Sequence, residues 1–180
     1  LRDSEKELKT LERDIAPLQE VKSPFPRITY QEALDLLSDA GFDVEWGQGF
    51  GGDEETVIAE AFDKPVIIHR YPFECNAFYM LEDPEDSRLT MSMDIIAPEG
   101  YGEIVGGSAR EHNLERLMKR VDQHKLPHDP LQWYFDIRRY GGVPMAGFGM
   151  GFARTVMWIC GLQHVREALP YPRLINRIYP

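Results

Sequence analysis

The chain has 180 residues, of which 43% are hydrophobic, and a formal net charge of −10 at pH 7. This length and apolar content are enough for one packed core, so the sequence predicts a single domain over residues 1–180. No apolar run reaches the roughly 18 residues that a membrane helix needs, which predicts a soluble protein without membrane insertion. The acidic balance argues against binding of nucleic acid over the whole surface, although a local basic patch could still contact RNA.

Only two cysteines are present, Cys75 and Cys160, and they lack the CxxC spacing typical of structural zinc sites. They also provide no disulfide framework. The N-terminus has no signal-peptide pattern and begins in the middle of a helical pattern. We therefore expect a reducing compartment, cytoplasmic or organellar such as mitochondrial, and not secretion.

Helical periodicity dominates the first part of the chain. Apolar residues recur at helical spacing over residues 1–16 and stop at Pro17, which predicts an amphipathic helix. The segment Thr29-Tyr30-Gln31-Glu32 has the capping-box pattern. It predicts a helix over residues 32–40 that ends at Gly41.

A glycine-rich segment, residues 47–52, comes before a third predicted helix over residues 54–62. Asp53 is the expected N-cap of this helix. A glycine-rich loop before a helix can hold a phosphate, but the acidic residues 53–55 favour a mobile loop.

From Pro65 the pattern changes to short apolar runs typical of strands. The expected strands cover residues 66–69, 77–81, 89–96, 102–106 and 145–150. Between the last two we expect a helix over residues 111–124 and another that starts at Asp129-Pro130 with an aspartate cap. Strands adjacent in sequence favour antiparallel pairing. The predicted fold class is therefore α+β, an antiparallel sheet flanked by helices, with Trp133, Trp158 and Cys160 in its core.

The stretch from Gly147 to Arg154 carries the strongest chemical signal. Glycines at positions 147, 149 and 151 alternate along the expected strand, and without Cβ atoms a base or ribose could touch its backbone. Arg154, in the first turn of the next helix, would reach a phosphate oxygen. This pattern indicates a nucleotide site, but it also occurs where a helix packs closely on a sheet, and both interpretations stay open.

The same stretch resembles the third signature motif of class II aminoacyl-tRNA synthetases. Further segments resemble the asparaginyl-tRNA synthetase family in the same order: Phe25–Tyr30, Ala77–Met80, Ala97–Ser108, Trp158–Gly161, Pro172-Arg173 and Arg177–Pro180. The resemblance covers nearly the whole chain, but only the last part of such an enzyme. It implies a class II catalytic-domain fold truncated at its N-terminal side, with the anticodon-binding barrel and the first two motifs upstream of Leu1.

In this family, the carboxylate of asparagine attacks ATP, and the resulting adenylate then esterifies tRNA(Asn). The resemblance implies ATP and Mg²⁺ as cofactors and tRNA(Asn) as a partner. It places ATP at Glu103, Gly147, Gly149, Gly151 and Arg154, and asparagine at Gly106, Gly107, Ser108 and Arg110. Arg110 and Arg154 are the implied catalytic residues. Glu103 is the implied magnesium ligand, with Asp94 on the preceding strand as a second candidate.

The sequence departs from the family pattern around this site. Asn76 stands in place of a lysine, Ala109 and Ala153 each in place of a glutamate, and Met145-Ala146 in place of a His-Ser pair. Gln48-Gly49 replaces a usual pair of acids. Losing one such polar group commonly costs about 3 kcal/mol of transition-state stabilisation.

Two functional hypotheses follow from the resemblance and these departures. The departures favour a degenerate paralogue, a pseudoenzyme that serves as a structural module in a larger, ribonucleoprotein assembly. Protein subunits, with RNA as a further partner, would then cover an open sheet edge. The alternative is the C-terminal half of an active asparagine–tRNA ligase. A homodimer stays open, although family members dimerise mostly through the first motif.

Overall fold

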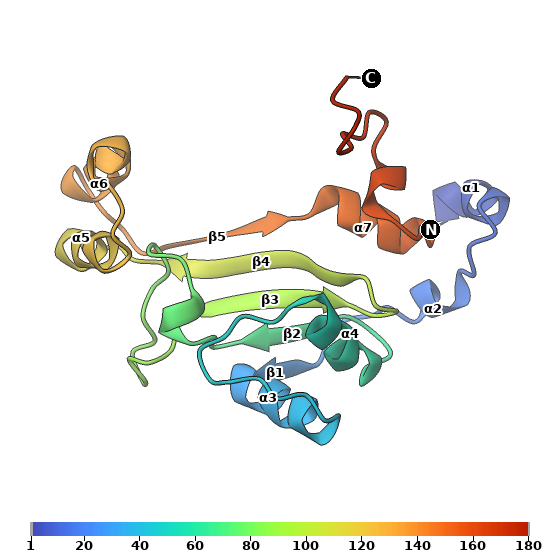
Figure 1. The fold of residues 1–180 in the computed structure, drawn as a ribbon, viewed down its shortest axis with the longest axis horizontal. Coiled ribbons are helices and arrows are strands. Elements are labelled where there is room, and N and C mark those ends of the chain that lie inside the picture. Colours follow the sequence, from blue (N-terminus) through green and yellow to red (C-terminus); the bar gives the residue numbers. More distant parts are fainter. Residues whose placement is uncertain (1, 180) are drawn as a thin grey trace.

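The structure is a computed structural model that describes residues 2–179, and its centre is a five-stranded sheet in the order β1-β2-β3-β4-β5 (Figure 1). The strands are β1 (Arg27–Thr29), β2 (Val66–His69), β3 (Ser92–Ala97), β4 (Gly102–Arg110) and β5 (Met145–Met150). The pairs β2–β3, β3–β4 and β4–β5 are antiparallel, as the sequence predicts. The short strand β1 was not predicted, and it pairs in parallel with β2, so the sheet is mixed.

The α-helices are α1 (Glu5–Thr10), α2 (Ala16–Gln19), α3 (Tyr30–Asp39), α4 (Gly52–Glu60), α5 (Leu114–Gln123), α6 (Gln132–Arg139) and α7 (Phe152–Cys160). Short 3-10 turns cover Arg2–Ser4, Phe73–Cys75, Asp129–Leu131 and Val165–Ala168. Figure 1 shows α5 and α6 at one end of the sheet and α7 with the N-terminal helices at the other. Helices α3 and α4 lie beside β1 and β2. None of the helices in residues 2–179 is both long and apolar enough to cross a membrane.

The strand predicted over residues 77–81 is wrong. This segment is a turn that joins the sheet only through an isolated bridge between Met80 and Arg110. Polar side chains hold the turn, because Asn76 Nδ2 donates to the Pro72 carbonyl and Arg120 Nη2 donates to the Ala77 carbonyl, both at 3.1 Å. These contacts divert the backbone from the extended path that its apolar residues predict.

Two other strands have shifted bounds. β3 begins at Ser92, later than predicted, because Leu89 and Thr90 only form isolated bridges. β4 extends to Arg110, four residues beyond the predicted end at Gly106. The predicted bounds of β2 and β5 are confirmed.

The single helix predicted over residues 1–16 is wrong. The chain turns after α1, where Glu12 has a positive φ of 56°, and Pro17 lies inside the first turn of α2 instead of ending a helix. Proline is well tolerated there because a first-turn N–H has no partner within the helix. The periodicity was real, but it is divided between two short helices.

The capping box at the start of α3 is confirmed. Thr29 Oγ1 accepts from the Glu32 backbone N at 3.2 Å, and Glu32 Oε2 accepts from the Thr29 backbone N at 2.6 Å. The expected cap of α4 is wrong, because that helix starts earlier, at Gly52. Its first turn is closed by Glu54, whose Oε2 accepts from the Gly51 backbone N at 3.0 Å.

The bounds of α5 and α6 also differ from prediction. Glu111 donates its backbone N–H to the Tyr79 carbonyl and so continues the sheet, which delays α5 until Asn113 caps it. Asp129 lies in a 3-10 turn and makes no capping bond to α6.

The core consists of three clusters. One lies between the sheet and helices α3 and α4, a second between the β3–β4 hairpin and α7, and a third between α5 and α6. Trp158 is buried, as predicted, whereas Cys160 is only half-buried. Trp133 is 65% exposed, so its predicted core role is wrong. The aromatic residues of α6 that reach the core are Phe135, which is buried, and Tyr134, which packs against that cluster.

Candidate active site

Two carboxylates meet over a glycine in the middle of the sheet. Asp94 on β3 pairs with Gly106 on β4, so their Cβ positions share one face. A Cβ atom at Gly106 would lie 2.6 Å from Glu103 Oε1 and 3.1 Å from Asp94 Oδ1. Both carboxylates therefore occupy the space that a side chain at position 106 would need.

An irregularity in β4 makes this meeting possible. Glu103 and Gly106 are three positions apart, and in a regular strand their Cβ atoms would point to opposite faces. The register shifts between Ile95 and Ile96, so that Ile95 pairs with Val105, Ile96 pairs with Glu103, and Ile104 has no partner on β3. A bulge of this kind re-aims side chains. Here it directs Glu103 toward Asp94.

The Asp94 carboxyl has a strongly perturbed pKa. Burial, together with the nearby negative charge of Glu103, raises its pKa from 3.8 to about 7, although the Tyr71 hydroxyl bonds to it and acts in the opposite direction. Burial also raises the pKa of Tyr71, which keeps this hydroxyl a hydrogen-bond donor. A cation between the two carboxylates would relieve their repulsion.

These donors fit magnesium in one of its usual modes. Mg²⁺ prefers oxygen ligands and is commonly held by one or two carboxylates together with substrate phosphates. Asp94 and Glu103 provide such a pair. Within residues 2–179 no group of three or more His, Cys, Asp or Glu side chains is arranged for a metal. A site here would therefore complete its coordination from the nucleotide and water.

Arg154 approaches the same pair from α7. Its Nη1 donates to the Glu103 carbonyl oxygen at 2.8 Å, and the side chain is exposed, which leaves further N–H groups for a phosphate. Glu103 and Arg154 line a cavity of about 420 Å³ between α4, the β3–β4 turn and α7. The placement of Arg154 in the first turn of α7 is confirmed.

The three glycines of the predicted nucleotide strand have different surroundings. A Cβ atom at Gly147 would lie 3.2 Å from Arg110 Nη2, so a side chain there would crowd this arginine. Gly149 has open space around it, which leaves the strand bare for a ligand. Gly151 stands at the N-cap of α7 and donates its backbone N–H to the Ile104 carbonyl at 2.8 Å.

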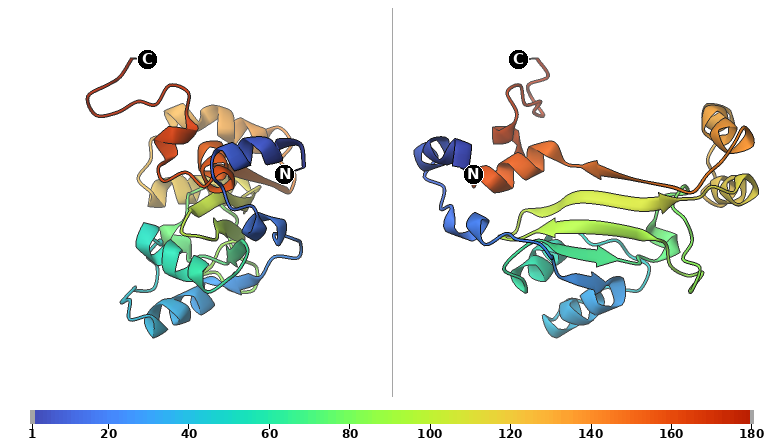
Figure 2. Two further views of the ribbon diagram at one scale, coloured as in Figure 1. Left: turned by 90° about the vertical axis from the view of Figure 1, so that its right-hand side faces the viewer. Right: turned by 180° about the vertical axis from the view of Figure 1, so that it is seen from behind.

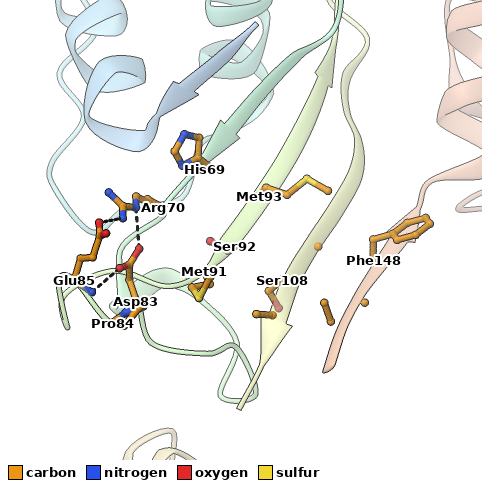
Figure 3. Close-up of a pocket in the computed structure, with 14 residues that line it drawn as sticks. His69, Arg70, Asp83, Pro84, Glu85, Met91, Ser92, Met93, Ser108 and Phe148 are labelled. Carbon is orange, nitrogen blue, oxygen red and sulfur yellow. Dashed lines mark hydrogen bonds and ion pairs between the residues drawn. The ribbon is translucent and has the colours of Figure 1, made fainter. Parts of the chain in front are cut away.

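A second cavity, of about 580 Å³, lies further along β4 (Figure 3). Its lining includes Gly107 and Ser108 from β4, and Ala146, Gly147 and Phe148 from β5. The opposite wall is charged: Arg70 Nε bonds to Asp83 Oδ2 at 2.8 Å, and Arg70 also pairs with Glu85. The residues predicted to hold asparagine thus divide, because Gly106 lies with the carboxylate pair and not in this cavity.

Arg110 lies at the end of β4 beside this second cavity. Its Nη1 donates to Ser108 Oγ at 2.8 Å, its Nη2 donates to the Gly147 carbonyl at 3.1 Å, and its guanidinium carbon lies 4.6 Å from the centre of the Tyr79 ring. The structure therefore brings Arg110 and Ser108, which the resemblance assigns to asparagine, together with Gly147, which it assigns to ATP. The guanidinium is held on two sides.

Three of the positions that depart from the family pattern lie at this end. Ala109 lines the second cavity, and Met145 pairs with Arg110 across the β4–β5 ladder. Asn76 donates to the hydroxyls of Thr90 and Ser92, and Ser92 also lines the cavity. The carboxylate pair lies away from these three positions, whereas Ala153, another departure, directly precedes Arg154 in the first turn of α7.

Sequence reasoning missed Glu55, whose Oε2 accepts from the Glu103 backbone N at 2.8 Å. Burial raises the pKa of Glu55 above its usual value, although the hydrogen bond from the Glu103 backbone acts in the opposite direction. A signal was present, because Glu55 shares the inner face of α4 with the buried residues Ile58 and Ala59, at spacings of three and four. Tyr71, which was left out of the predicted site, carries no local signal of its proximity to Asp94.

Comparisons with known proteins show which family the chain belongs to. Asparagine–tRNA ligases of Desulforamulus reducens and Pelotomaculum thermopropionicum are 54% and 50% identical to this chain, over 174 and 180 residues. These matches cover 97% and 100% of the chain but only 41% and 42% of the relatives. The chain thus spans about two fifths of their length and matches the C-terminal part of their catalytic domain.

Solved structures give the same result for the fold. The asparaginyl-tRNA synthetase of Pyrococcus horikoshii superimposes with a TM-score of 0.93 at 46% identity, covering 97% of this chain and 42% of that one. An aspartyl-tRNA synthetase of Entamoeba histolytica matches at 29% identity with a TM-score of 0.82, covering 89% of this chain and 34% of that one. A family model described as tRNA synthetases class II (D, K and N) matches residues 2–175. The chain therefore belongs to the class II tRNA synthetases of this family.

Proposed function

We propose that this chain forms the part of an amino-acid-activating site of the asparagine–tRNA ligase type that holds magnesium-ATP. The observation that carries the proposal is the meeting of Asp94, Glu103 and Arg154 over positions that have no side chain. A structure of the Pyrococcus horikoshii synthetase complexed with asparaginyl-adenylate has the same fold, with a TM-score of 0.93. Because that relative binds an adenylate, it supports a nucleotide site in this chain.

Residues near the two ends of β4 would bind different parts of the substrates. Asp94 and Glu103 would hold Mg²⁺, which neutralises phosphate charge when bound, and Arg154 would donate to the terminal phosphate. Gly149 would leave room for the base or ribose. Arg110, fixed by Ser108 and Gly147, would orient the amino acid in the second cavity. In the complete protein, the activated amino acid would pass to tRNA(Asn).

A second candidate function is favoured by the altered positions, three of which lie at the amino-acid end. Asn76, Ala109, Met145 and Ala153 each replace a polar or charged family residue, which suits a degenerate paralogue that keeps the fold without the reaction. Such a protein would serve as an interaction module, for example in a ribonucleoprotein. ATP–pyrophosphate exchange by the full-length protein separates the candidates: asparagine-dependent exchange supports the ligase, and its absence from protein that binds magnesium-ATP supports the module.

Calorimetric titration of the chain with magnesium-ATP tests the nucleotide assignment. We expect Arg154→Ala to weaken binding about tenfold to a hundredfold, since it loses charge-assisted bonds of roughly 1.5–3 kcal/mol. Arg116→Ala, at an exposed arginine on α5, is the matched control and should leave the affinity unchanged. Binding that is indifferent to Arg154, or no binding by folded protein, contradicts the assignment.

A further inference from the structure

Glu55 lies outside the motif segments named in the sequence analysis, yet it contacts a residue at the centre of the candidate site. Its Oε2 accepts a hydrogen bond from the Glu103 backbone N at 2.8 Å. Arg154 Nη1 donates to the carbonyl oxygen of the same residue, also at 2.8 Å. Both polar backbone groups of Glu103 are therefore bound by side chains, one from α4 and one from α7.

The backbone of Glu103 needs these partners because it lies beyond the end of the β4–β5 ladder. The pairing of β4 with β5 begins only at Val105, so β5 offers Glu103 no backbone partner. A backbone polar group that is buried from water without a partner costs about as much free energy as a lost hydrogen bond. Glu55 and Arg154 take the place of the missing strand, and both come from elements that contact β4.

Gly102 opens the space in which the two side chains reach the strand. A Cβ atom at this position would lie 2.5 Å from Glu55 Oε2 and 3.5 Å from Arg154 Nη1. Its φ of 71° also favours glycine. A side chain here would displace the carboxylate of Glu55 from its hydrogen bond.

We propose that Glu55 is a positioning residue of the nucleotide site. Together with Gly102, it fixes the backbone of Glu103 by a hydrogen bond, so that the carboxylate of Glu103 and the guanidinium of Arg154 both contact one bound magnesium-ATP. This inference rests on the proposed function. It adds a residue from α4 to a site otherwise built on the sheet and α7.

Two variants of Glu55 test whether the hydrogen bond to the Glu103 backbone is what matters for binding. Glu55→Ala removes the acceptor, and we expect the dissociation constant for magnesium-ATP to rise at least tenfold. Glu55→Gln keeps an acceptor oxygen, and the rise should stay below threefold. Gly102→Ala should reproduce the effect of Glu55→Ala, and the double variant should be no weaker than either, because both changes break one contact.

A matched variant on α4 controls for loss of stability alone. Thr56→Ala removes the bond from Thr56 Oγ1 to the Gly52 carbonyl, 2.8 Å long, without touching Glu103. It should leave the affinity for magnesium-ATP unchanged, whatever its effect on the melting temperature. If Thr56→Ala and Glu55→Ala weaken binding equally at equal loss of stability, Glu55 is only structural and the inference is overturned.

Amide hydrogen exchange provides a readout that needs no nucleotide. In Glu55→Ala the backbone N–H of Glu103 should exchange faster, whereas in Glu55→Gln and Thr56→Ala its protection should persist. Unchanged protection in Glu55→Ala overturns the inference. If the unaltered chain binds no magnesium-ATP, the proposed function fails, and the exchange rates still decide whether Glu55 holds Glu103. If it binds and Glu55→Ala binds equally well, the inference alone fails.

Discussion

At the scale of single residues, the charged groups of the site depend on glycines. Gly106 leaves room for the carboxylates of Asp94 and Glu103, and Gly102 leaves room for Glu55 and Arg154. The result is a crowded negative pair whose repulsion the chain alone does not neutralise. Folding stability should therefore depend on pH through Asp94.

We predict that Asp94→Asn stabilises the chain at pH 8 and has little effect at pH 4. The folded pKa of Asp94, about 7, lies above its ordinary value of 3.8, so the folded state keeps a proton that the unfolded state loses between these values. Stability therefore falls as pH rises through this window, by up to about 4 kcal/mol at about 1.4 kcal/mol per pKa unit. Asp94→Asn does not lose this stability, because its side chain does not ionise. Urea unfolding at several pH values measures the difference in free energy of unfolding.

Two controls accompany this measurement. Asp63→Asn, at an exposed aspartate, should give the same difference from the unaltered chain at both pH values. Added Mg²⁺ should narrow the gap between Asp94→Asn and the unaltered chain at pH 8, because the ion would stabilise the ionised pair. An Asp94→Asn protein that is less stable than the unaltered chain at pH 8 refutes the prediction.

At the scale of elements, the helix boundaries that agree best with prediction are those whose sequence signals lie within a few residues of each other. The start of α3 is set by a reciprocal pair of bonds between Thr29 and Glu32. Where a residue distant in sequence binds the backbone, the structure can differ from the one that the local pattern predicts. The apolar run at 77–81 is a turn because Arg120, on α5, binds its backbone.

We predict that Thr29→Ala lowers the free energy of unfolding by about 1 kcal/mol, the usual loss for an N-cap hydroxyl. Chemical denaturation with unchanged m-value would measure it. Thr10→Ala is the control, because the Thr10 hydroxyl bonds only within the last turn of the short helix α1. A cap variant that is no less stable than this control would show that tertiary packing alone holds α3.

At the scale of the whole molecule, one arginine joins the N-terminal segment to the far end of the sheet, where the two lie side by side (Figure 2). Arg13 makes two bonds to the Glu99 carboxylate, of 2.8 and 2.7 Å, and its Nε donates to the Ile159 carbonyl of α7. A Cβ atom at Gly161 would lie 2.7 Å from Arg13 Cδ. The arginine thus ties α7 to the turn after β3.

We predict that Arg13→Met lowers the free energy of unfolding by about 2 kcal/mol at pH 7, the scale of a charge-assisted bond. Hydrogen bonding to Arg13 lowers the pKa of Glu99 below 4.5, so this contribution is present above that value and is lost as pH falls through the folded pKa. Thermal melts at pH 7 and pH 3 measure this difference. Arg166→Met, at an exposed arginine, is the control, and a gap that persists at pH 3 contradicts the prediction.

The free side of β5 is the second whole-molecule feature. Within residues 2–179, β5 pairs only with β4, and Phe148, Met150 and Phe152 are 70%, 53% and 75% exposed. An unpaired edge with apolar side chains favours association.

We predict that the chain binds an apolar dye and self-associates, and that Met150→Lys with Phe152→Lys reduces both effects. Sedimentation velocity measures the association. Gln123→Lys, at an exposed position on α5, adds the same kind of charge elsewhere and should change neither effect. A sharply sedimenting monomer that binds no dye would refute this prediction.

Much of the fold and part of the site were predictable from the sequence. The bounds of β2 follow from a short apolar run, and those of β5 from apolar residues that alternate with glycines. The place of Arg154 follows from the end of β5. The resemblance led to the asparaginyl-tRNA synthetase family, which the comparisons confirm. The short strand β1 escaped prediction because three residues carry too little periodicity.

By itself, the sequence determined the elements whose signals are local: the cap of α3, the glycine strand β5 and the start of α7. Caps, periodicity and missing Cβ atoms act within a few residues, so they can be read without the fold. Only the tertiary structure decided that Glu103 turns toward Asp94, because the irregularity at Ile104 depends on how β3 and β4 pair. It also decided that Glu55 binds Glu103, since no local pattern encodes a contact across 48 positions.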